Sequence, residues 1–151
     1  MHISFICTGN ICRSPMADLV FREHLRRAGL DARVTVTSAG TGAWHIGEPA
    51  DPRTQKVLAH HGYPTEHVAA QIGDHHLSAD LLVAMDNSHL RAVRRMVDDP
   101  DRVRLLRSFD PDADGAEVAD PYFGGPNGFE DTMSMVEAAM PGLLDWVREN
   151  L

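Results

Sequence analysis

The sequence predicts an α/β fold: a single-domain, three-layer αβα architecture around a central four-stranded parallel sheet. Short apolar, β-branched segments alternate along the chain with longer segments of helical periodicity. Such alternation implies parallel strands whose connecting helices cover both faces of one sheet. The 151 residues have the length of one ordinary domain and suffice for a sizeable core. We therefore expect residues 1–151 to form one domain.

The short apolar segments predict four strands, at Ile3–Cys7, Arg33–Thr37, Asp80–Met85 and Val103–Leu106. Apolar spacing and glycine stop signals predict four helices, at Pro15–Ala28, Asp51–His61, Asn87–Val97 and Thr132–Asn150. Pro141 is expected to kink or break the last helix, because proline has no N–H to donate. Ligands of such folds bind at the carboxyl ends of strands, so chemistry is expected in the loop after Cys7.

Composition and charge exclude several classes of protein. The formal net charge is −8, which argues against a general binder of nucleic acid or of anionic membranes. No apolar run approaches the roughly 20 residues of a membrane span, and no ordinary signal peptide is expected at the N-terminus. The two cysteines, Cys7 and Cys12, fit a reduced, cytoplasmic setting. The nine histidines lack the spacing of a metal cluster, and no metal is expected.

Residues 7–15, Cys-Thr-Gly-Asn-Ile-Cys-Arg-Ser-Pro, join the first predicted strand to the first predicted helix. Ser14 is expected to cap this helix and Pro15 to be its first residue. The backbone N–H groups of such a loop and the helix dipole together favour an anion. Gly9 and Asn10 tolerate the left-handed backbone that a tight cradle requires. The sequence therefore predicts a phosphate-binding loop after the first strand.

Cys7 and Arg13 are the reactive and charged residues of this loop. A cysteine beside a helix N-terminus and an arginine is favoured as the thiolate, which is nucleophilic toward a bound phosphate. The guanidinium of Arg13 offers a planar fork to two phosphate oxygens. The Ser14 hydroxyl can donate to the sulfur and stabilise it as a leaving group. The motif implies phosphoryl transfer to Cys7 and then hydrolysis, with a buried strand cysteine and a surface arginine as the alternative.

These residues resemble the signature of the low-molecular-weight protein tyrosine phosphatases. The match is almost letter for letter over residues 7–17 and continues, in the family's order and spacing, through Ser38–Thr41, Trp44-His45-x-Gly47, Ala50-Asp51, Met85-Asp86 and Asp120-Pro121-Tyr122. It covers nearly the whole chain and looks closest to the actinobacterial members, some of which are exported without a signal peptide.

The resemblance implies an enzyme that hydrolyses phosphotyrosine or other aryl phosphate monoesters through a phosphocysteine intermediate, without metal or cofactor. It implies that Cys7 is the nucleophile and that Arg13 clamps the phosphoryl group. The other substrate-binding residues of the loop would be Thr8, Gly9, Asn10, Ile11, Cys12 and Ser14. It also implies that Cys12 forms a reversible disulfide with Cys7, which shields the nucleophile from over-oxidation. A small, buried filler is the alternative for Cys12.

A phenolate leaving group needs a proton, which a carboxylic acid near the cradle can supply. Spacing alone does not choose among the aspartates of the loop-like stretch 110–120. The resemblance points to Asp120, since Asp120-Pro121 matches the family's loop, and implies that Asp120 is first acid and then base. The candidates for aromatic walls around the substrate ring, with ordinary packing as the alternative, are Trp44, Tyr122 and Phe123. Many family members carry two tyrosines where this chain has Tyr122-Phe123.

Supporting roles are expected at three positions. In the family the residue matching Asn10 is pinned by polar neighbours, and Ser38 is the matching serine. Asp86 ends a predicted strand, where its carboxylate can orient Arg13 or instead cap the next helix. The segment Glu66–Gln71 departs from the family, which commonly carries arginine here. A surface contact is expected to be lost there, with no effect on the cradle.

Other functions share parts of this pattern and fit the residues less well. An arsenate reductase of the same fold needs further cysteines as a relay, and none follows Cys12. A non-catalytic phosphate-binding module is disfavoured because Cys7, Arg13 and Asp120 are all present. A nucleotide-binding domain is disfavoured because the loop lacks G-x-G-x-x-G and the Walker lysine. Phosphoarginine phosphatases belong to the same family, so that substrate stays open.

The expected partners are phosphotyrosine-containing proteins or small aryl phosphates, with inorganic phosphate or vanadate as inhibitors. Neither nucleic acid nor a membrane is expected as a partner. The chain is expected to be a monomer or a weak dimer.

Overall fold

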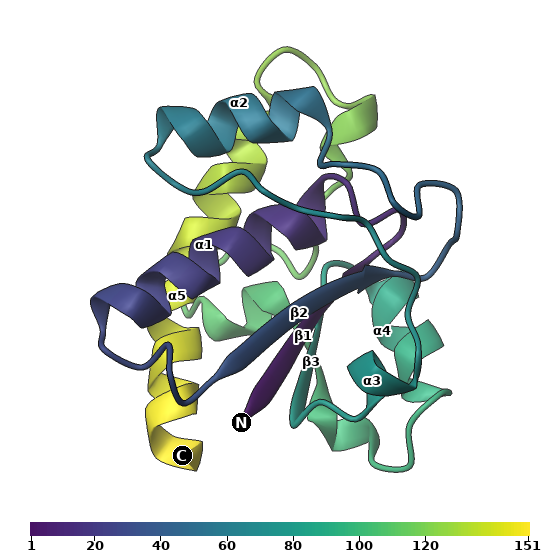
Figure 1. Cartoon of the computed structure of the whole chain (residues 1–151), viewed down its shortest axis with the longest axis vertical. Helices are drawn as coiled ribbons and strands as arrows, with labels where there is room; N and C mark the ends of the chain where they lie inside the picture. The colour runs from purple at the N-terminus through teal and green to yellow at the C-terminus, as the bar shows by residue number, and fades with distance from the viewer.

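The computed structural model describes residues 1–151 and has a four-stranded sheet between two groups of helices (Figure 1). The strands are β1 (His2–Cys7), β2 (Thr35–Gly40), β3 (Leu81–Ala84) and β4 (Val103–Leu105). Their order is β2-β1-β3-β4, and every pair is parallel. In the central register, Ile6 of β1 lies opposite Ala39 of β2 and Ala84 of β3. The predicted α/β class and parallel sheet are confirmed.

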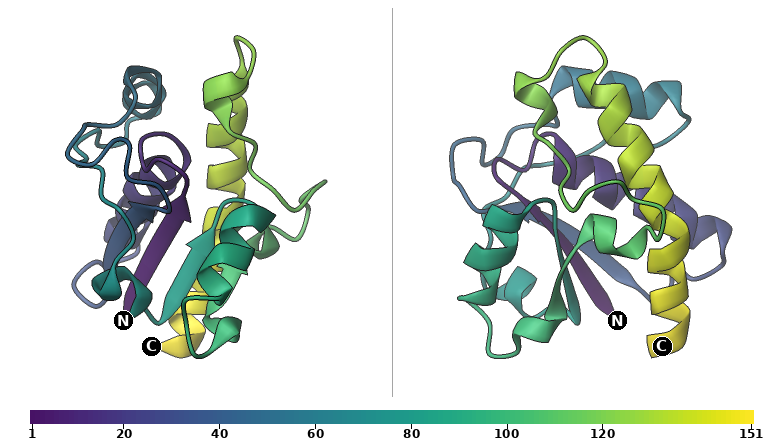
Figure 2. Two further views of the ribbon diagram at one scale, coloured as in Figure 1. Left: turned by 90° about the vertical axis from the view of Figure 1, so that its right-hand side faces the viewer. Right: turned by 180° about the vertical axis from the view of Figure 1, so that it is seen from behind.

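The α-helices are α1 (Arg13–Arg27), α2 (Pro52–His60), α3 (Asp74–Leu77), α4 (Asn87–Arg94) and α5 (Gly128–Asn150). Short 3₁₀ helices lie at η1 (Pro100–Arg102), η2 (Leu106–Phe109) and η3 (Pro121–Phe123). Figure 1 shows α1 and α5 on one side of the strands and α3 and α4 on the other. In both views of Figure 2, α2 lies at the opposite end of the molecule from the two chain termini. None of the helices combines the length and apolar character needed to cross a membrane.

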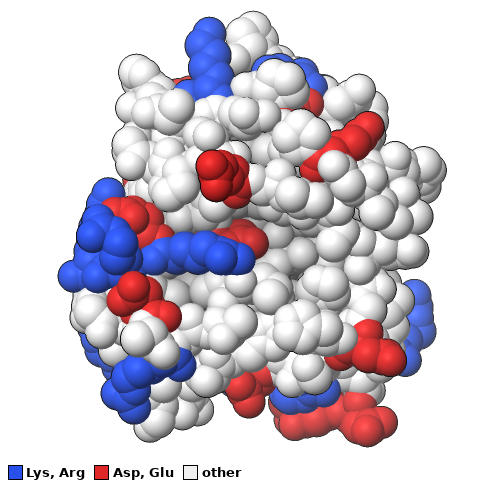
Figure 3. Space-filling view, in the orientation of Figure 1, with Lys and Arg blue, Asp and Glu red and all other residues white.

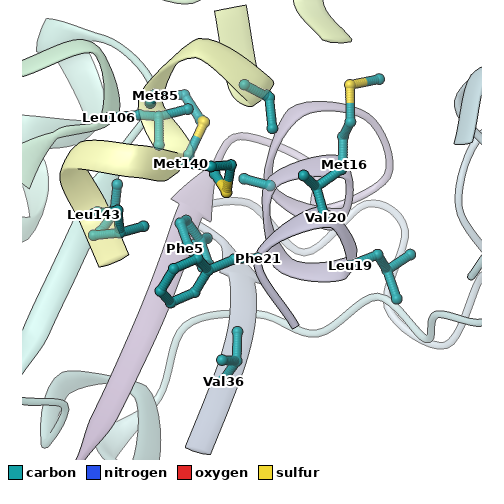
Figure 4. Packing of buried hydrophobic residues seen from close by; sticks show 14 of the residues in the cluster. Phe5, Met16, Leu19, Val20, Phe21, Val36, Met85, Leu106, Met140 and Leu143 are labelled. Atoms are coloured by element: carbon teal, nitrogen blue, oxygen red, sulfur yellow. The ribbon is translucent and has the colours of Figure 1, made fainter. Parts of the chain in front are cut away.

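The two faces of the sheet bury different residues, because successive side chains of a strand point to opposite faces. Phe5 of β1 faces α1 and α5, where its ring meets that of Phe21 edge-on at a centroid distance of 5.8 Å (Figure 4). Met140 and Leu143 of α5 are buried in the same core. Ile6 faces the opposite layer, where the core residues are Ala39, Ala79, Leu82, Val93 and Val103. Alternate side chains of β1 thus pack into the two cores on either side of the sheet, and this fixes the position of Cys7 at the end of the strand.

Some predicted boundaries are wrong. β2 continues to Gly40 instead of ending at Thr37, because its last residues are small and give no apolar alternation. α1 begins at Arg13, so Ser14 is inside the helix and is not its cap; Cys12 holds the N-cap position, with no capping side chain. α5 begins at Gly128, four residues before the predicted start. The single turn α3 and the 3₁₀ helices were not predicted, since segments this short carry no periodicity.

Helix α5 runs unbroken through Pro141, so of the two expected effects, a kink or a break, the break is wrong. A proline inside a helix removes one backbone hydrogen bond, and its ring crowds the carbonyl of the preceding turn. The residues on either side of Pro141 and Gly142 are Met140 and Leu143, and both side chains are fully buried. Packing of this apolar face against the sheet therefore outweighs the local preference of proline.

Candidate active site

The phosphate-binding loop starts where β1 ends, between β2 on one side and β3 on the other. The connection that leaves β1 leads to β2 and the connection that leaves β3 leads to β4, toward opposite edges of the sheet, and α/β folds place ligands at such a point. Backbone bonds tie the loop to β2: Thr41 N donates to Cys7 O at 2.9 Å and Gly42 N donates to Thr8 O at 3.0 Å. A Cβ on Gly40 would lie 2.5 Å from Thr8 O, so only glycine fits at the end of β2.

Cys7 lies at the bottom of this loop and is 3% exposed. Its Sγ is 2.9 Å from Ser14 Oγ and accepts a hydrogen bond from Asn10 N at 3.3 Å. Ser14 Oγ already accepts from Asn10 Nδ2 at 2.7 Å, which leaves its own proton free to point toward the sulfur. The arrangement supplies two donors to a thiolate at this position.

Asn10 has the left-handed backbone that was predicted, with φ of 58°. Its amide nitrogen also donates to Ser38 Oγ at 3.0 Å, and its amide oxygen accepts from Ala70 N at 2.9 Å. Gly9 does not adopt this conformation. Glycine suits position 9 for another reason: a Cβ there would lie 3.0 Å from His45 Cδ2.

Arg13 is 4% exposed and is held from two sides. Its Nη1 donates to Asp86 Oδ2 and to Val118 O, each at 2.9 Å. Its Nη2 donates to Thr8 Oγ1 at 3.4 Å and lies 3.8 Å from Asp120 Oδ2. The guanidinium is therefore fixed at one nitrogen and faces the loop with the other.

Asp86 contacts Arg13 and also caps α4, because its two oxygens have different partners. Oδ2 takes the guanidinium, while Oδ1 accepts from Ser88 N at 2.9 Å and His89 N at 3.1 Å. Burial alone would raise the pKa of this carboxyl, but the hydrogen bonds from Ser88 and His89 and the nearby charges outweigh it and lower the pKa to about 2. Asp86 is thus an anion at neutral pH.

A cavity of about 240 Å³ opens above the loop. Its lining residues are Cys7, Thr8, Gly9, Ile11, Cys12, Arg13, Trp44, His45, Asp120, Tyr122 and Phe123. Trp44 and Phe123 stand at its mouth, 75% and 84% exposed. The Asp120 carboxylate accepts from Tyr122 N at 3.0 Å. Of the predicted site residues, Asn10, Ser14, Ser38 and Asp86 lie outside the lining and hold the residues that form it.

Two histidines contact the loop although the sequence had no signal for them. His67 Nε2 donates to Asn10 O at 2.7 Å, so segment 66–71 contacts the cradle through a residue that was not among the predicted site residues. His89 Nε2 lies 2.8 Å from Thr8 Oγ1. Its Nδ1 is 3.1 Å from Asp86 Oδ1 but makes no hydrogen bond to it. Burial lowers the pKa of both rings, that of His89 to about 4.

Cys7 and Cys12 are both free thiols in this structure. Burial, followed by the nearby Asp51 carboxylate, raises the pKa of Cys12 to about 12. Cys12 is therefore a neutral thiol at physiological pH. The two cysteines of the loop are thereby distinguished, because the donors described above converge on Cys7 alone.

Residues 2–151 match the model of the family described as low molecular weight phosphotyrosine protein phosphatase. The chain is 54% identical over 153 residues to low molecular weight protein-tyrosine phosphatase A of Mycobacterium tuberculosis, covering 100% of this chain and 94% of that protein. It is also 54% identical over 156 residues to a low molecular weight protein-tyrosine-phosphatase of Streptomyces coelicolor, covering 99% and 95%.

Two solved structures share the whole fold. A protein tyrosine phosphatase from Entamoeba histolytica superposes with a TM-score of 0.94 at 29% identity, covering 99% of this chain and 98% of that chain. A Drosophila arginine phosphatase superposes with a TM-score of 0.89 at 29% identity, covering 97% and 98%.

Proposed function

The chain belongs to the low-molecular-weight phosphotyrosine protein phosphatase family and is a protein-tyrosine phosphatase, and we propose that Cys7, Arg13 and Asp120 carry out its reaction. The observation that carries this assignment is the convergence of the three residues on one cavity. Cys7 Sγ lies at its base with two donors, Arg13 lies beside it, and Asp120 is 3.8 Å from Arg13. We also propose that residues 1–151 act as one catalytic domain.

In the first step, the Cys7 thiolate attacks phosphorus and forms a sulfur–phosphorus bond. The bond from phosphorus to the aryl oxygen breaks, and Asp120 gives its proton to that oxygen. Arg13 and the loop N–H groups hold the phosphoryl oxygens. These donors are fixed before substrate binds, so they stabilise the transition state without having to reorganise.

In the second step, the Asp120 carboxylate takes a proton from water while the water oxygen attacks phosphorus. The sulfur–phosphorus bond breaks and the electron pair returns to Cys7. The Ser14 hydroxyl, 2.9 Å from Sγ, stabilises the departing thiolate. Phosphate is then released from the same donors that bound the substrate, which supports phosphate and vanadate as competitive inhibitors.

The walls of the cavity favour an aryl phosphate over a phosphoguanidine. Ile11, Trp44, Tyr122 and Phe123 offer apolar and aromatic surface to a flat ring. Asp120 is the only carboxylate among the lining residues, and proton transfer already uses it. A phosphoarginine substrate would leave its guanidinium without an anionic partner here. Phosphotyrosine-containing proteins or small aryl phosphates are the proposed substrates, and the two free thiols support a reducing, cytoplasmic setting.

The test is hydrolysis of a phosphotyrosine peptide, 4-nitrophenyl phosphate and a phosphoarginine peptide, with chelator present. Cys7→Ser should abolish turnover, and Asp120→Asn should lower it by about 10²–10⁴-fold, as expected for loss of a general acid. Asp112→Asn is the matched control, because Asp112 is exposed in the same stretch and should leave turnover unchanged. Tight vanadate binding without turnover of any substrate would contradict the assignment and indicate a binding module.

A further inference from the structure

Arg53 connects the phosphate-binding loop to the segment that carries Asp120. It is the second residue of α2, whose N-cap is Asp51. Asp51 N donates to Ile11 O at 2.9 Å, which fixes this end of α2 to the loop. The buried Asp51 carboxylate holds the guanidinium through two bonds, from Nε to Oδ1 at 3.1 Å and from Nη2 to Oδ2 at 3.0 Å. A fork bound in this way has a set orientation.

The same guanidinium lies over two aromatic rings. Its central carbon is 5.0 Å from the ring centroid of Tyr122 and 4.6 Å from that of Phe129, both within the range of cation–π attraction. Phe129 is a buried residue of α5, so its ring is held in place beneath the guanidinium of Arg53. Tyr122 is the second residue after Asp120, and its N–H donates to the Asp120 carboxylate at 3.0 Å. Arg53 therefore contacts the residue that orients the proposed acid.

The acid segment, residues 119–126, has few other attachments. On its N-terminal side, Val118 is pinned by its N–H to Met85 O at 2.8 Å and by its carbonyl to Arg13. Every hydrogen bond of the segment stays within it or goes to Gly128, where α5 begins. The polar contacts that reach the rest of the molecule are the approach of Asp120 to Arg13 and the stack of Tyr122 on Arg53. On the C-terminal side of Asp120, Arg53 is thus the polar anchor, next to the buried Pro121.

We propose that Arg53 is a positioning residue for catalysis: held by Asp51 on the side of the phosphate loop, it stacks with Tyr122 and sets the place of the Asp120 carboxyl over the leaving group. The proposal rests on the proposed role of Asp120 as acid. Loss of Arg53 should then act on proton donation and leave phosphate binding intact. The effect should grow as the leaving phenol becomes less acidic, because such phenolates depend most on a proton donor.

The test compares Arg53→Met, Arg53→Lys and Arg27→Met by their kcat/KM for phenyl phosphate and for 4-nitrophenyl phosphate, whose leaving group is a much stronger acid. Arg27 is the matched control, because its guanidinium also lies over an aromatic ring, 5.6 Å from the ring centroid of Tyr63. Arg27 is in the last turn of α1 and does not line the cavity. The inhibition constant for vanadate measures anion binding by the phosphate-binding loop. Thermal unfolding reports stability.

Arg53→Met should lower kcat/KM for phenyl phosphate about fivefold, from the loss of cation–π contacts made by a half-exposed guanidinium and of its hydrogen bonds to Asp51. The loss for 4-nitrophenyl phosphate should be several times smaller, and vanadate inhibition should change by less than about twofold. Arg53→Lys should recover part of the loss, and Arg27→Met should lose nothing. In an Asp120→Asn background, Arg53→Met should add little, because both changes remove the same proton transfer.

Equal losses with both substrates, or a parallel loss of vanadate inhibition, would overturn the proposal, since Arg53 would then act on the cradle. No loss with either substrate would also overturn it and leave Arg53 a packing residue. Failure of the proposed function is distinguishable: Asp120→Asn itself would then show no dependence on the leaving group. If only the Arg53 proposal fails, that dependence in Asp120→Asn persists.

Discussion

At Asn10, one amide side chain satisfies partners on three separate segments. Its nitrogen donates to Ser14 in α1 and to Ser38 in β2, and its oxygen accepts from Ala70 N in the connection to α3. The residue is fully buried and has φ of 58°. Asparagine is among the few residues that adopt this conformation at small cost. The curvature of the loop thus depends on a neutral residue whose only contact with a reacting atom is the hydrogen bond from its N–H to Cys7 Sγ.

Asn10→Ala is expected to destabilise the protein by about 2 kcal/mol or more, because it leaves buried partners unsatisfied and strains the backbone. Phosphate affinity should fall with it, since the loop N–H groups lose their alignment. Denaturant unfolding and phosphate inhibition measure the two effects. Asn127→Ala is the control, because Asn127 is exposed and its side chain makes no capping bond. Unchanged phosphate affinity in Asn10→Ala would contradict this role.

At the scale of elements, close backbone contacts join helices to the turns beside them. Gly142 of α5 lies directly against the carbonyl of Phe109 at the end of η2, where a Cβ would overlap the oxygen. Gly40 does the same for the end of β2 and the phosphate loop. Both contacts require glycine for proximity, since neither residue has a positive φ.

Gly142→Ala tests this packing against helix propensity. Alanine alone would stabilise a helix by about 1 kcal/mol relative to glycine. Here overpacking should dominate, so we expect a net destabilisation of about 1–3 kcal/mol by denaturant unfolding. Gly125→Ala is the control, because a Cβ there would meet open space and its φ is not positive. A stabilised Gly142→Ala protein would show that α5 shifts easily away from η2.

At the scale of the whole molecule, an acidic protein binds an anionic substrate. The net charge of −8 repels phosphate at long range, and on the face in Figure 3 acidic side chains are interspersed among the basic ones. Attraction must therefore be local, from Arg13 and the loop N–H groups.

The pH dependence of stability is also a property of the whole molecule, because burial lowers the pKa of histidines in several elements: His2, His24, His67, His76 and His89.

These lowered pKa values predict a loss of stability in weak acid. A histidine with a folded pKa below the unfolded value of about 6.5 binds more protons when unfolded, so its contribution is complete above that pH and falls below it. For His89, with a folded pKa of about 4, the loss between pH 7 and pH 5 is on the order of 2 kcal/mol. The Asp86 carboxyl, with a pKa of about 2, does not titrate in this window.

The measurement is the free energy of unfolding against pH for wild type, His89→Gln and His60→Gln. We expect a shallower slope between pH 5 and pH 7 in His89→Gln. The exposed His60 serves as the control and should leave the slope unchanged. An identical slope in all three proteins would contradict the assignment to buried His89.

Much of the fold follows from local patterns, and the exceptions have physical causes. Residues 3–15 predict a strand, a loop and a helix because each element is specified by neighbours in the chain. The expected break at Pro141 was wrong because packing overrides the local preference of proline, and the end of β2 was missed because its last residues are small. Spacing could not choose Asp120 among the nearby aspartates, and the choice came from the resemblance to the family.

The sequence by itself determined the parallel α/β class, the phosphate loop, and a thiol and guanidinium within seven residues of each other. Only the tertiary structure decided which distant groups support them. His67 and His89 reach the loop across 57 and 81 residues, and Arg53 reaches Tyr122 across the fold. These contacts depend on the strand order β2-β1-β3-β4, which brings the carboxyl ends of separate strands to one edge. Local periodicity carries no information about the strand order, because that order is decided by which helix and sheet faces pack together in the folded chain.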